Sequence, residues 1–138
     1  MLRDAYRPGL QALREIHRQA ITAVPRNLKG SVNIDETLSE TLPNEPRWDY
    51  GVGYIGEDGE KVFWVEFHPA SIGEINSVLR KLEWLKGWTR ANAPDLSAMR
   101  REFIWIASGA SGFGRGTPQV KRLANAGIRF VGGHLTLN

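Results

Sequence analysis

Three residues of types that bind divalent cations or transfer protons stand in one stretch of the chain: Asp49, Glu66 and His68. Two strand-like runs flank Asp58-Gly59, a dipeptide typical of two-residue turns, so this stretch predicts a β-hairpin. With that turn, Asp49 lies opposite His68, and the alternation of side chains puts Asp49, Glu66 and His68 on one face. A loop of odd length would put Asp49 on the opposite face from Glu66 and His68.

This cluster suits metal-assisted hydrolysis. Hard divalent cations prefer carboxylate oxygens and retain bound waters, so Asp49 and Glu66 are predicted to hold Mg²⁺ or Mn²⁺. Such a cation lowers the pKa of a bound water and stabilises charge that develops on a phosphodiester. His68 titrates near neutral pH and is the candidate general base. The alternative is structural: Asp49 and His68 form an ion pair at the strand end, and arginine or backbone donors satisfy Glu66.

The surroundings of Glu66 make it the most informative of these residues. The second strand of the hairpin is apolar on both faces, which is typical of a central strand covered on both sides. A carboxylate there loses hydration and needs a partner. On the first strand, Trp48, Tyr50, Val52 and Tyr54 are expected to share the core face. Gly51, expected opposite Glu66, and Gly53 would leave open space beside it, or mark a bulge or a closely packed helix.

The elements before the hairpin follow from spacing. Apolar residues recur at helical intervals over residues 8–23, between Pro8 and Pro25, and predict a helix that carries Glu15 and His17. His17 is interpreted as a residue at the boundary of the core and not as a ligand. Alternation over residues 28–34 predicts a short strand, and residues 35–46, which are polar and contain two prolines, are expected to form a loop.

The elements after the hairpin end the chain in α/β alternation. Ser71 and Glu74 form a capping-box pattern at the start of a helix that reaches about Arg90. Its expected buried stripe is Ile72, Ile75, Leu79, Leu82 and Leu85. Further predictions are a loop at 92–97, a buried strand at 102–108, a glycine-rich loop at 108–117, a helix begun by Thr117-Pro118 and ended at Gly127, and a final strand at 128–137.

The resulting order is αβββαβαβ, which predicts a single α/β domain over residues 1–138 with a mixed sheet sandwiched by helices. An acidic residue at the start of the second strand and Glu66-Phe67-His68 at the end of the third resemble the PD-(D/E)XK nuclease superfamily, which has the restriction-endonuclease-like fold. The resemblance covers most of the chain in element order. In motif it covers Asp49 and Glu66 to His68, with Glu15 as a further acidic position.

The resemblance implies a magnesium-dependent endonuclease whose catalytic residues are Asp49, Glu66, His68 and Lys81. Two positions depart from the family pattern: Trp48 stands where the family has proline, and His68 stands where it has a lysine that activates the attacking water. In some family members a lysine of the following helix takes that part, and Lys81 or Arg80 is in place for it. The missing lysine also favours an alternative, a nuclease-like domain that does not cut and instead binds nucleic acid or protein.

The charge distribution fits a nucleic-acid partner. Residues 1–34 hold six basic and two acidic residues, residues 35–75 hold two and ten, and residues 76–138 hold ten and three. Basic ends around an acidic middle are expected to attract phosphates to a carboxylate site, although solvated loops and helix faces give the same pattern. The predicted nucleic-acid-binding residues are Arg80, Lys81, Arg115, Lys121 and Arg122. The glycine-rich loop lacks a Gly-Lys-Ser/Thr ending and is therefore not a Walker A loop.

Composition excludes several other classes of function. The chain has no cysteine, which removes disulfides, thiolate metal sites and thiol nucleophiles and fits a reducing cytoplasm. No apolar run is long enough to span a membrane, and the N-terminus lacks the apolar core of a signal peptide, so a cytoplasmic protein is expected. Trp84, Trp88 and Trp105 are candidates for the interface of a homodimer.

Overall fold

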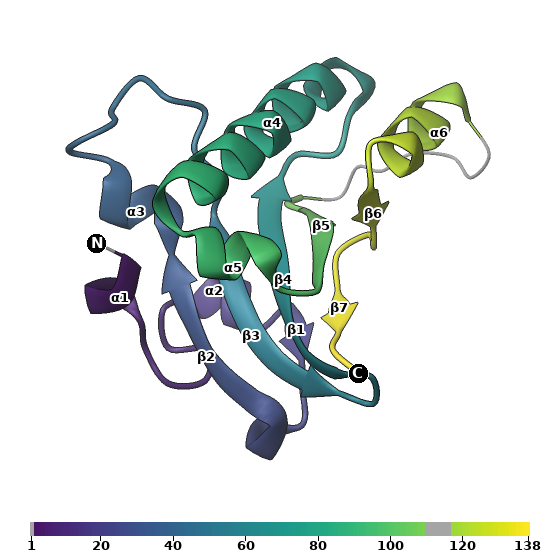
Figure 1. The fold of residues 1–138 in the computed structure, drawn as a ribbon. Helices are drawn as coiled ribbons and strands as arrows, with labels where there is room; N and C mark the ends of the chain where they lie inside the picture. Colours follow the sequence, from purple (N-terminus) through teal and green to yellow (C-terminus); the bar gives the residue numbers. More distant parts are fainter. Residues whose placement is uncertain (1, 110–116) are drawn as a thin grey trace.

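The computed structural model describes residues 2–109 and 117–138, with side chains from Asp4 onward in these ranges. A five-stranded mixed sheet forms its centre, in the spatial order β2-β3-β4-β5-β6 (Figure 1). The first three strands form an antiparallel meander, and β5 and β6 run parallel to β4. The strands are β2 (Leu28–Asn33), β3 (Tyr50–Gly56), β4 (Gly59–His68), β5 (Arg101–Ala107) and β6 (Ile128–Phe130).

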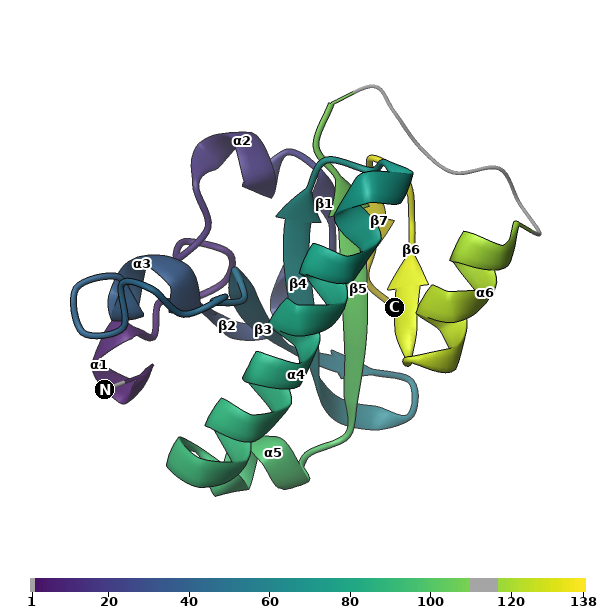
Figure 2. The same cartoon turned by 90° about the horizontal axis from the view of Figure 1, so that it is seen from above.

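Helices make both crossovers between the parallel strands. The long helix α4 (Ile75–Asn92) and the short α5 (Pro94–Ala98) connect β4 to β5, and α6 (Pro118–Asn125) precedes β6. Successive crossovers of one hand that advance in one direction place their helices on the same face of a sheet. Figure 2 shows α4, α5 and α6 on one side of the sheet, with α2 (Glu15–Arg18) and β1 (Ile21–Thr22) on the other.

Each face of the sheet has its own apolar core. The core under α4 contains Trp48, Val62, Trp64 and Trp105. The core on the opposite face contains Tyr50, Val52, Phe63 and Ile104, together with Leu13, Ile21, Leu135 and Leu137 from the two ends of the chain. The predicted mixed α/β sheet is therefore confirmed. The expected sandwich of helices is not, because the second face is covered by irregular chain, the four-residue α2 and the parallel pair of β1 with β7 (Leu135–Thr136).

The hairpin is confirmed with a different register. Glu57 and Asp58 form the turn, Gly56 pairs with Gly59, and every partner on β4 lies two residues earlier than expected. A turn at Asp58-Gly59 would need positive φ at both residues. Among the described residues only glycines have positive φ, and Gly59 takes φ +105° at the start of β4. A shift of two residues keeps every side chain on its predicted face.

The shifted register changes two expectations about the site face. Gly51 pairs with Trp64 and not with Glu66. A Cβ built on Gly51 would lie 2.6 Å from the Trp64 ring, so this glycine admits an indole and leaves no open space beside Glu66. Trp48 precedes β3 and packs in the core under α4, away from Tyr50, Val52 and Tyr54, because the alternation of the strand does not extend to it.

The helix predicted over residues 8–23 is wrong. That segment holds only α2 and the two-residue β1, and Leu13 and Ile21 still reach the core. These two residues are buried by tertiary packing on the sheet without a long helix, whereas Ile16 is 68% exposed. Within the predicted loop 35–46, Asn33 caps a short helix, α3 (Ile34–Leu38), through a hydrogen bond from the Glu36 amide. Short helices α1 (Leu2–Ala5), η1 (Pro25–Asn27) and η2 (Ile72–Glu74) complete the described set.

The later elements follow the predictions more closely. Thr117 caps α6 by accepting a hydrogen bond from the Val120 amide, as expected. The buried stripe of α4 contains Ile75, Leu82 and Leu85 as predicted, together with Val78 and Thr89. Of the other predicted members, Leu79 is only partly buried, and Ile72 lies in η2 and is 67% exposed. The predicted loop at 92–97 contains α5, and the final strand is split into β6 and β7. The predicted glycine-rich loop lies mostly outside the described residues. None of the described helices is long and apolar enough to cross a membrane.

Candidate active site

Asp49 and Glu66 lie side by side where β3 begins and β4 approaches its end. The Asp49 amide donates a hydrogen bond to Glu66 Oε1 over 3.1 Å, and the Phe67 amide donates to Asp49 Oδ2 over 2.8 Å. These bonds continue the hairpin pairing beyond Tyr50 and Val65, and they use carboxylates in place of a carbonyl ladder. The backbone of the hairpin therefore holds both carboxylates in place, and Glu66 is fully buried.

Lys81 and His68 surround the buried Glu66 carboxylate. Lys81 Nζ forms an ion pair and hydrogen bond with Glu66 Oε2. His68 Nδ1 lies 3.4 Å from the same oxygen, and His68 Nε2 lies 3.0 Å from Glu74 Oε2. A carboxylate buried without such partners would be strongly destabilising, so these contacts are what permits Glu66 in the core.

Helix α4 positions Lys81 because the chain turns back over the sheet after β4. Val78 and Leu82 of α4 are buried against the sheet, and Lys81 lies at the edge of that buried stripe, where its long stem reaches Glu66. The predicted capping box is absent. Ser71 makes no side-chain cap, and the Glu74 carboxylate that was expected to complete the box contacts His68.

The pKa values of three titratable groups in the cluster are shifted, each for its own reasons. Burial, followed by the neighbouring Glu66 carboxylate, raises the pKa of Asp49 from 3.8 to about 7, against the opposing effects of Lys81 and the Phe67 amide. The hydrogen bond to Glu66 is the main cause that raises the pKa of His68. Burial tends to lower the pKa of Lys81, but the charge and hydrogen bond of Glu66 outweigh it and raise that pKa. Lys81 and His68 are thus favoured as cations, which argues against His68 as a general base.

A polar pocket of about 270 Å³ opens beside Asp49. Its walls come from α2, α3 and the start of β3, and its residues are Arg14, His17, Asn33, Asp35, Glu36, Ser39, Asp49 and Tyr50. Sequence reasoning assigned only Asp49 of this set to the site. The short helices α2 and α3 lie in segments that were predicted as one long helix and as a loop. No local pattern therefore indicated that these segments contribute to the pocket.

His17 is built into the site through residues adjacent to both carboxylates. Its ring stacks on Phe67 with centroids 3.9 Å apart, and its Nδ1 lies 2.6 Å from the Tyr50 hydroxyl. Burial, and then the charge of Arg14, lowers the pKa of His17. The expectation that His17 lies at the boundary of the core is confirmed, and the structure adds that it faces the same pocket as Asp49. Glu15, on the same short helix, is exposed and does not line this pocket.

The donor set for a divalent cation is limited to two neighbouring carboxylates. In the part of the chain that the structure describes, no group of three or more His, Asp or Glu side chains is placed to hold a metal ion. Magnesium commonly uses one or two carboxylates and completes its shell with water and substrate phosphate. Burial first, and the Glu66 carboxylate second, raise the pKa of Asp49, and a bound cation would oppose both effects. Asp49 and Glu66 therefore fit such an ion.

The other predicted basic residues lie on the outer surfaces of α4 and α6. Arg80 is exposed, and Arg122 donates a 2.8 Å hydrogen bond to Asn76, one helical turn before Arg80. Lys121 is exposed on α6, while Arg115 lies outside the described residues. Arg80, Lys121 and Arg122 do not line the pocket beside Asp49, so of the four predicted phosphate-binding residues that the structure describes, only Lys81 contacts the carboxylates.

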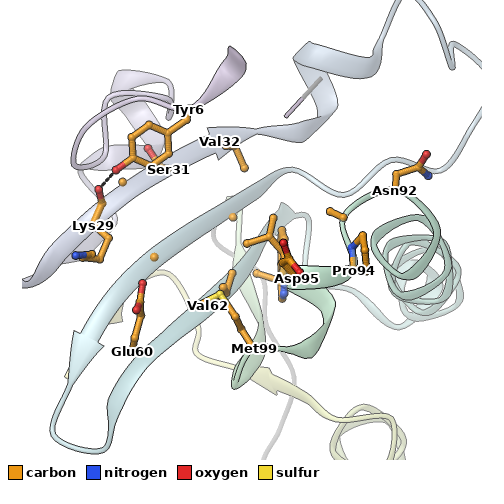
Figure 3. Close-up of a pocket in the computed structure, with 16 residues that line it drawn as sticks. Tyr6, Lys29, Ser31, Val32, Glu60, Val62, Asn92, Pro94, Asp95 and Met99 are labelled. Carbon is orange, nitrogen blue, oxygen red and sulfur yellow. Dashed lines mark hydrogen bonds between the residues drawn. The ribbon is translucent and has the colours of Figure 1, made fainter. Parts of the chain in front are cut away.

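An apolar groove of about 640 Å³ lies on the face of the sheet that α4 covers, beyond the end of that helix (Figure 3). Val62 and Met99 are at its floor, Tyr6 and Lys29 at the β2 side, and Asp95 at the α5 side. Gly51 and Trp64 also line it, and they form a cross-strand pair that is separated from Asp49 and Glu66 by the pair of Tyr50 and Val65. The carboxylates themselves do not line this groove.

The tryptophans expected at a dimer interface differ in exposure. Trp105 is fully buried, and its indole N–H donates to the His68 carbonyl over 2.9 Å, so it supports the site strand and offers no surface for a partner. Trp84 and Trp88 stack with centroids 5.9 Å apart and are partly buried against the core.

Comparisons of the chain with protein-family models, curated proteins and solved structures find no match.

Proposed function

We propose that this protein is a metal-dependent phosphodiesterase that hydrolyses nucleic acid. The observation that carries the proposal is the pair Asp49 and Glu66, two adjacent carboxylates of which one has its pKa raised to about 7 and borders an open pocket. The native state is destabilised when Asp49 ionises, and a buried charge that costs stability is more common at functional sites than at structural ones.

Each residue of the cluster has a part in this proposal. Asp49 and Glu66 would hold a divalent cation, which when bound supplies charge stabilisation and a more acidic water. Lys81, held as a cation by Glu66, contributes positive charge for the phosphate and stands in for the lysine that the motif lacks at His68. His68 is fixed between Glu66 and Glu74 and balances their charge.

The test compares the wild type with Asp49→Asn. Mn²⁺ and Mg²⁺ should raise the melting temperature of the wild type, and the wild type should cleave single- or double-stranded DNA or RNA in their presence. Both effects should disappear in Asp49→Asn. Glu102→Gln is the matched control, because it also removes one carboxylate but from an ion pair with Lys61. A wild type that responds to neither cation and cleaves none of the four substrates would contradict the proposal.

A second function has its own support. Both oxygens of Glu66 already have partners, and the described residues contain no group of three acidic or histidine side chains placed to hold a metal ion. These contacts suit a nuclease-like domain that binds nucleic acid without cutting it, or one that binds a protein through the apolar groove of Figure 3. Nucleic-acid binding that weakens steeply with salt and needs no cation, without cleavage, would identify the first of these.

A further inference from the structure

The pocket beside Asp49 has a basic wall that the sequence motifs do not assign. Arg14 precedes α2, and its amide donates a 3.3 Å hydrogen bond to the Tyr50 hydroxyl. The same hydroxyl contacts His17 Nδ1. Tyr50 follows Asp49 directly in the chain, so one tyrosine ties this wall to the candidate catalytic carboxylate. Arg14, His17 and Asp49 thus border one cavity of about 270 Å³.

The acidic groups of this pocket are already engaged. Asp35 accepts a 3.0 Å hydrogen bond from Arg47 Nε, Glu36 accepts a 3.3 Å bond from the Asn33 amide group, and Asp49 Oδ2 accepts from Phe67. Among the described residues, no carboxylate forms an ion pair with Arg14, and His17 Nε2 has no hydrogen-bond partner. The pocket therefore offers donors on one wall and the Asp49 carboxylate on the other.

The orientation of His17 can be derived from its partners. The Tyr50 oxygen accepts from the Arg14 amide, and its own proton needs an acceptor, for which His17 Nδ1 at 2.6 Å is suited. Neutral imidazole carries one N–H, so an Nδ1 that accepts leaves the proton on Nε2. The stack on Phe67 fixes the plane of the ring. His17 is then a hydrogen-bond donor that needs no charge, beside an arginine that always carries one.

We propose that Arg14 and His17 form the phosphate-binding wall of the site and hold the phosphate of a nucleic-acid strand next to Asp49. This inference rests on the proposed function, because Asp35, Glu36 and Asp49 make the pocket too acidic for a lone phosphate. A phosphate accompanied by a divalent cation at Asp49 balances those charges. Arg14 supplies a guanidinium whose two-pronged geometry suits phosphate oxygens, and His17 supplies a single N–H.

The experiment measures binding and does not depend on turnover. A fluorescent DNA hairpin with a single-stranded 5′ tail is titrated with protein in Ca²⁺, and the salt dependence of binding is recorded by anisotropy. Arg14→Gln should weaken binding about tenfold and lower the slope of log K against log salt by about one. Arg18→Gln is the matched control, because Arg18 is exposed on the same short helix and does not line the pocket. It should change binding by about twofold or less.

A variant of the second wall residue separates donation from packing. His17→Phe keeps a ring on Phe67 but removes the N–H and the acceptor of the Tyr50 hydroxyl, so it should lower the melting temperature somewhat and should weaken binding at a temperature where the variant is fully folded. Equal effects of Arg14→Gln and Arg18→Gln would overturn the inference, and so would a wild type that does not bind the hairpin. If binding depends on Arg14 but no cation raises the melting temperature and nothing is cleaved, the proposed hydrolysis fails while the phosphate-binding wall stands.

Discussion

At the scale of single residues, Asp49 combines a stability cost with a position at an open pocket. Burial, and then repulsion by Glu66, raise the pKa of its carboxyl to about 7, against the hydrogen bond from the Phe67 amide. Between pH 4 and pH 7 the native state therefore binds a proton that the unfolded chain releases. Stability must fall as pH rises through this window.

The first prediction concerns that fall. The substitution Asp49→Asn imitates the protonated carboxyl, so the variant should lose most of the decrease in unfolding free energy between pH 4 and pH 7. Because one pKa unit corresponds to about 1.4 kcal/mol, the variant should be more stable than the wild type by up to about 4 kcal/mol at pH 8. Urea unfolding at several pH values measures this. A variant that is less stable than the wild type at pH 8 would show that ionised Asp49 is a structural asset.

His68 adds to the same trend with the same sign. Its pKa is raised above 6.5, so the stability it contributes is present below pH 6.5 and is lost as pH rises through the raised value. His68→Gln keeps a polar side chain between Glu66 and Glu74 but does not titrate. It should leave a shallower pH dependence above pH 6.5 while the Asp49 effect at lower pH remains. The same urea series records the two variants side by side.

For a substitution of Lys81 we expect a loss of stability, and not the gain expected for Asp49→Asn. Lys81→Met removes the cation but keeps the packing of the stem, and leaves the fully buried Glu66 with only His68 and the Asp49 amide. Breaking a buried ion pair in this way costs about 3 kcal/mol or more at pH 8. Adding Glu66→Gln should recover much of that loss, because the uncompensated charge is gone. Additive losses in the double variant would show that the two side chains are not coupled.

At the scale of elements, the hairpin is what holds the carboxylates together. Gly51 on β3 sits under the Trp64 ring of β4, and a Cβ there would come within 2.6 Å of it. Trp64 is itself buried in the core under α4, so a shift of its ring would disturb that core. The close pairing of β3 with β4 next to the site thus depends on glycine at position 51, because glycine has no side chain.

Gly51→Ala should therefore destabilise the protein by about 1–3 kcal/mol through overpacking, despite the better strand propensity of alanine. Gly73→Ala serves as the control, since nothing lies within 4 Å of a Cβ built there and its φ is not positive. Thermal unfolding of both variants decides the matter. Equal stability of Gly51→Ala and the wild type would mean that the indole shifts freely and that the packing is loose.

At the scale of the whole molecule, both ends of the chain close the second face of the sheet. Ile21 of β1 pairs with Leu135 of β7, and Leu135 and Leu137 are buried against Tyr50, Val52 and Phe63. This core supports the face of β3 and β4 opposite to α4. It also anchors the segment that places Arg14 and His17 beside Asp49.

Leu135→Ala should cost about 2–5 kcal/mol, the range for removing a buried leucine side chain. Thr136→Ala, the exposed neighbour on the same strand, should change stability by less than about 0.5 kcal/mol. If the closing pair also positions the site, Leu135→Ala should weaken the DNA-hairpin binding described above under conditions where the variant is still folded. Unchanged binding in a folded but destabilised variant would separate the support of the fold from that of the site.

Local patterns determined a large share of this protein. Alternation and turn chemistry predicted β2 and the hairpin, a continuous apolar run predicted β5, and capping residues predicted α6, because the signals for these elements lie within a few residues. The parity of the hairpin was enough to group Asp49 with Glu66, whereas Lys81 or Arg80 of the following helix was nominated only by the family resemblance. The identity of the turn residues was not enough, since backbone φ at Asp58 decided the register.

Only the tertiary structure decided the rest. Residues 8–23 have helical spacing, but irregular chain and a short strand let Leu13 and Ile21 pack on the sheet. The free energy of burying these two side chains depends on distant residues, so no local pattern predicts it. For the same reason the sequence did not show that Arg14 and His17 meet Asp49, or that Glu74 leaves its expected cap for His68. Local propensity acts between near neighbours, whereas the burial of charge and apolar area is settled by residues far apart in the chain.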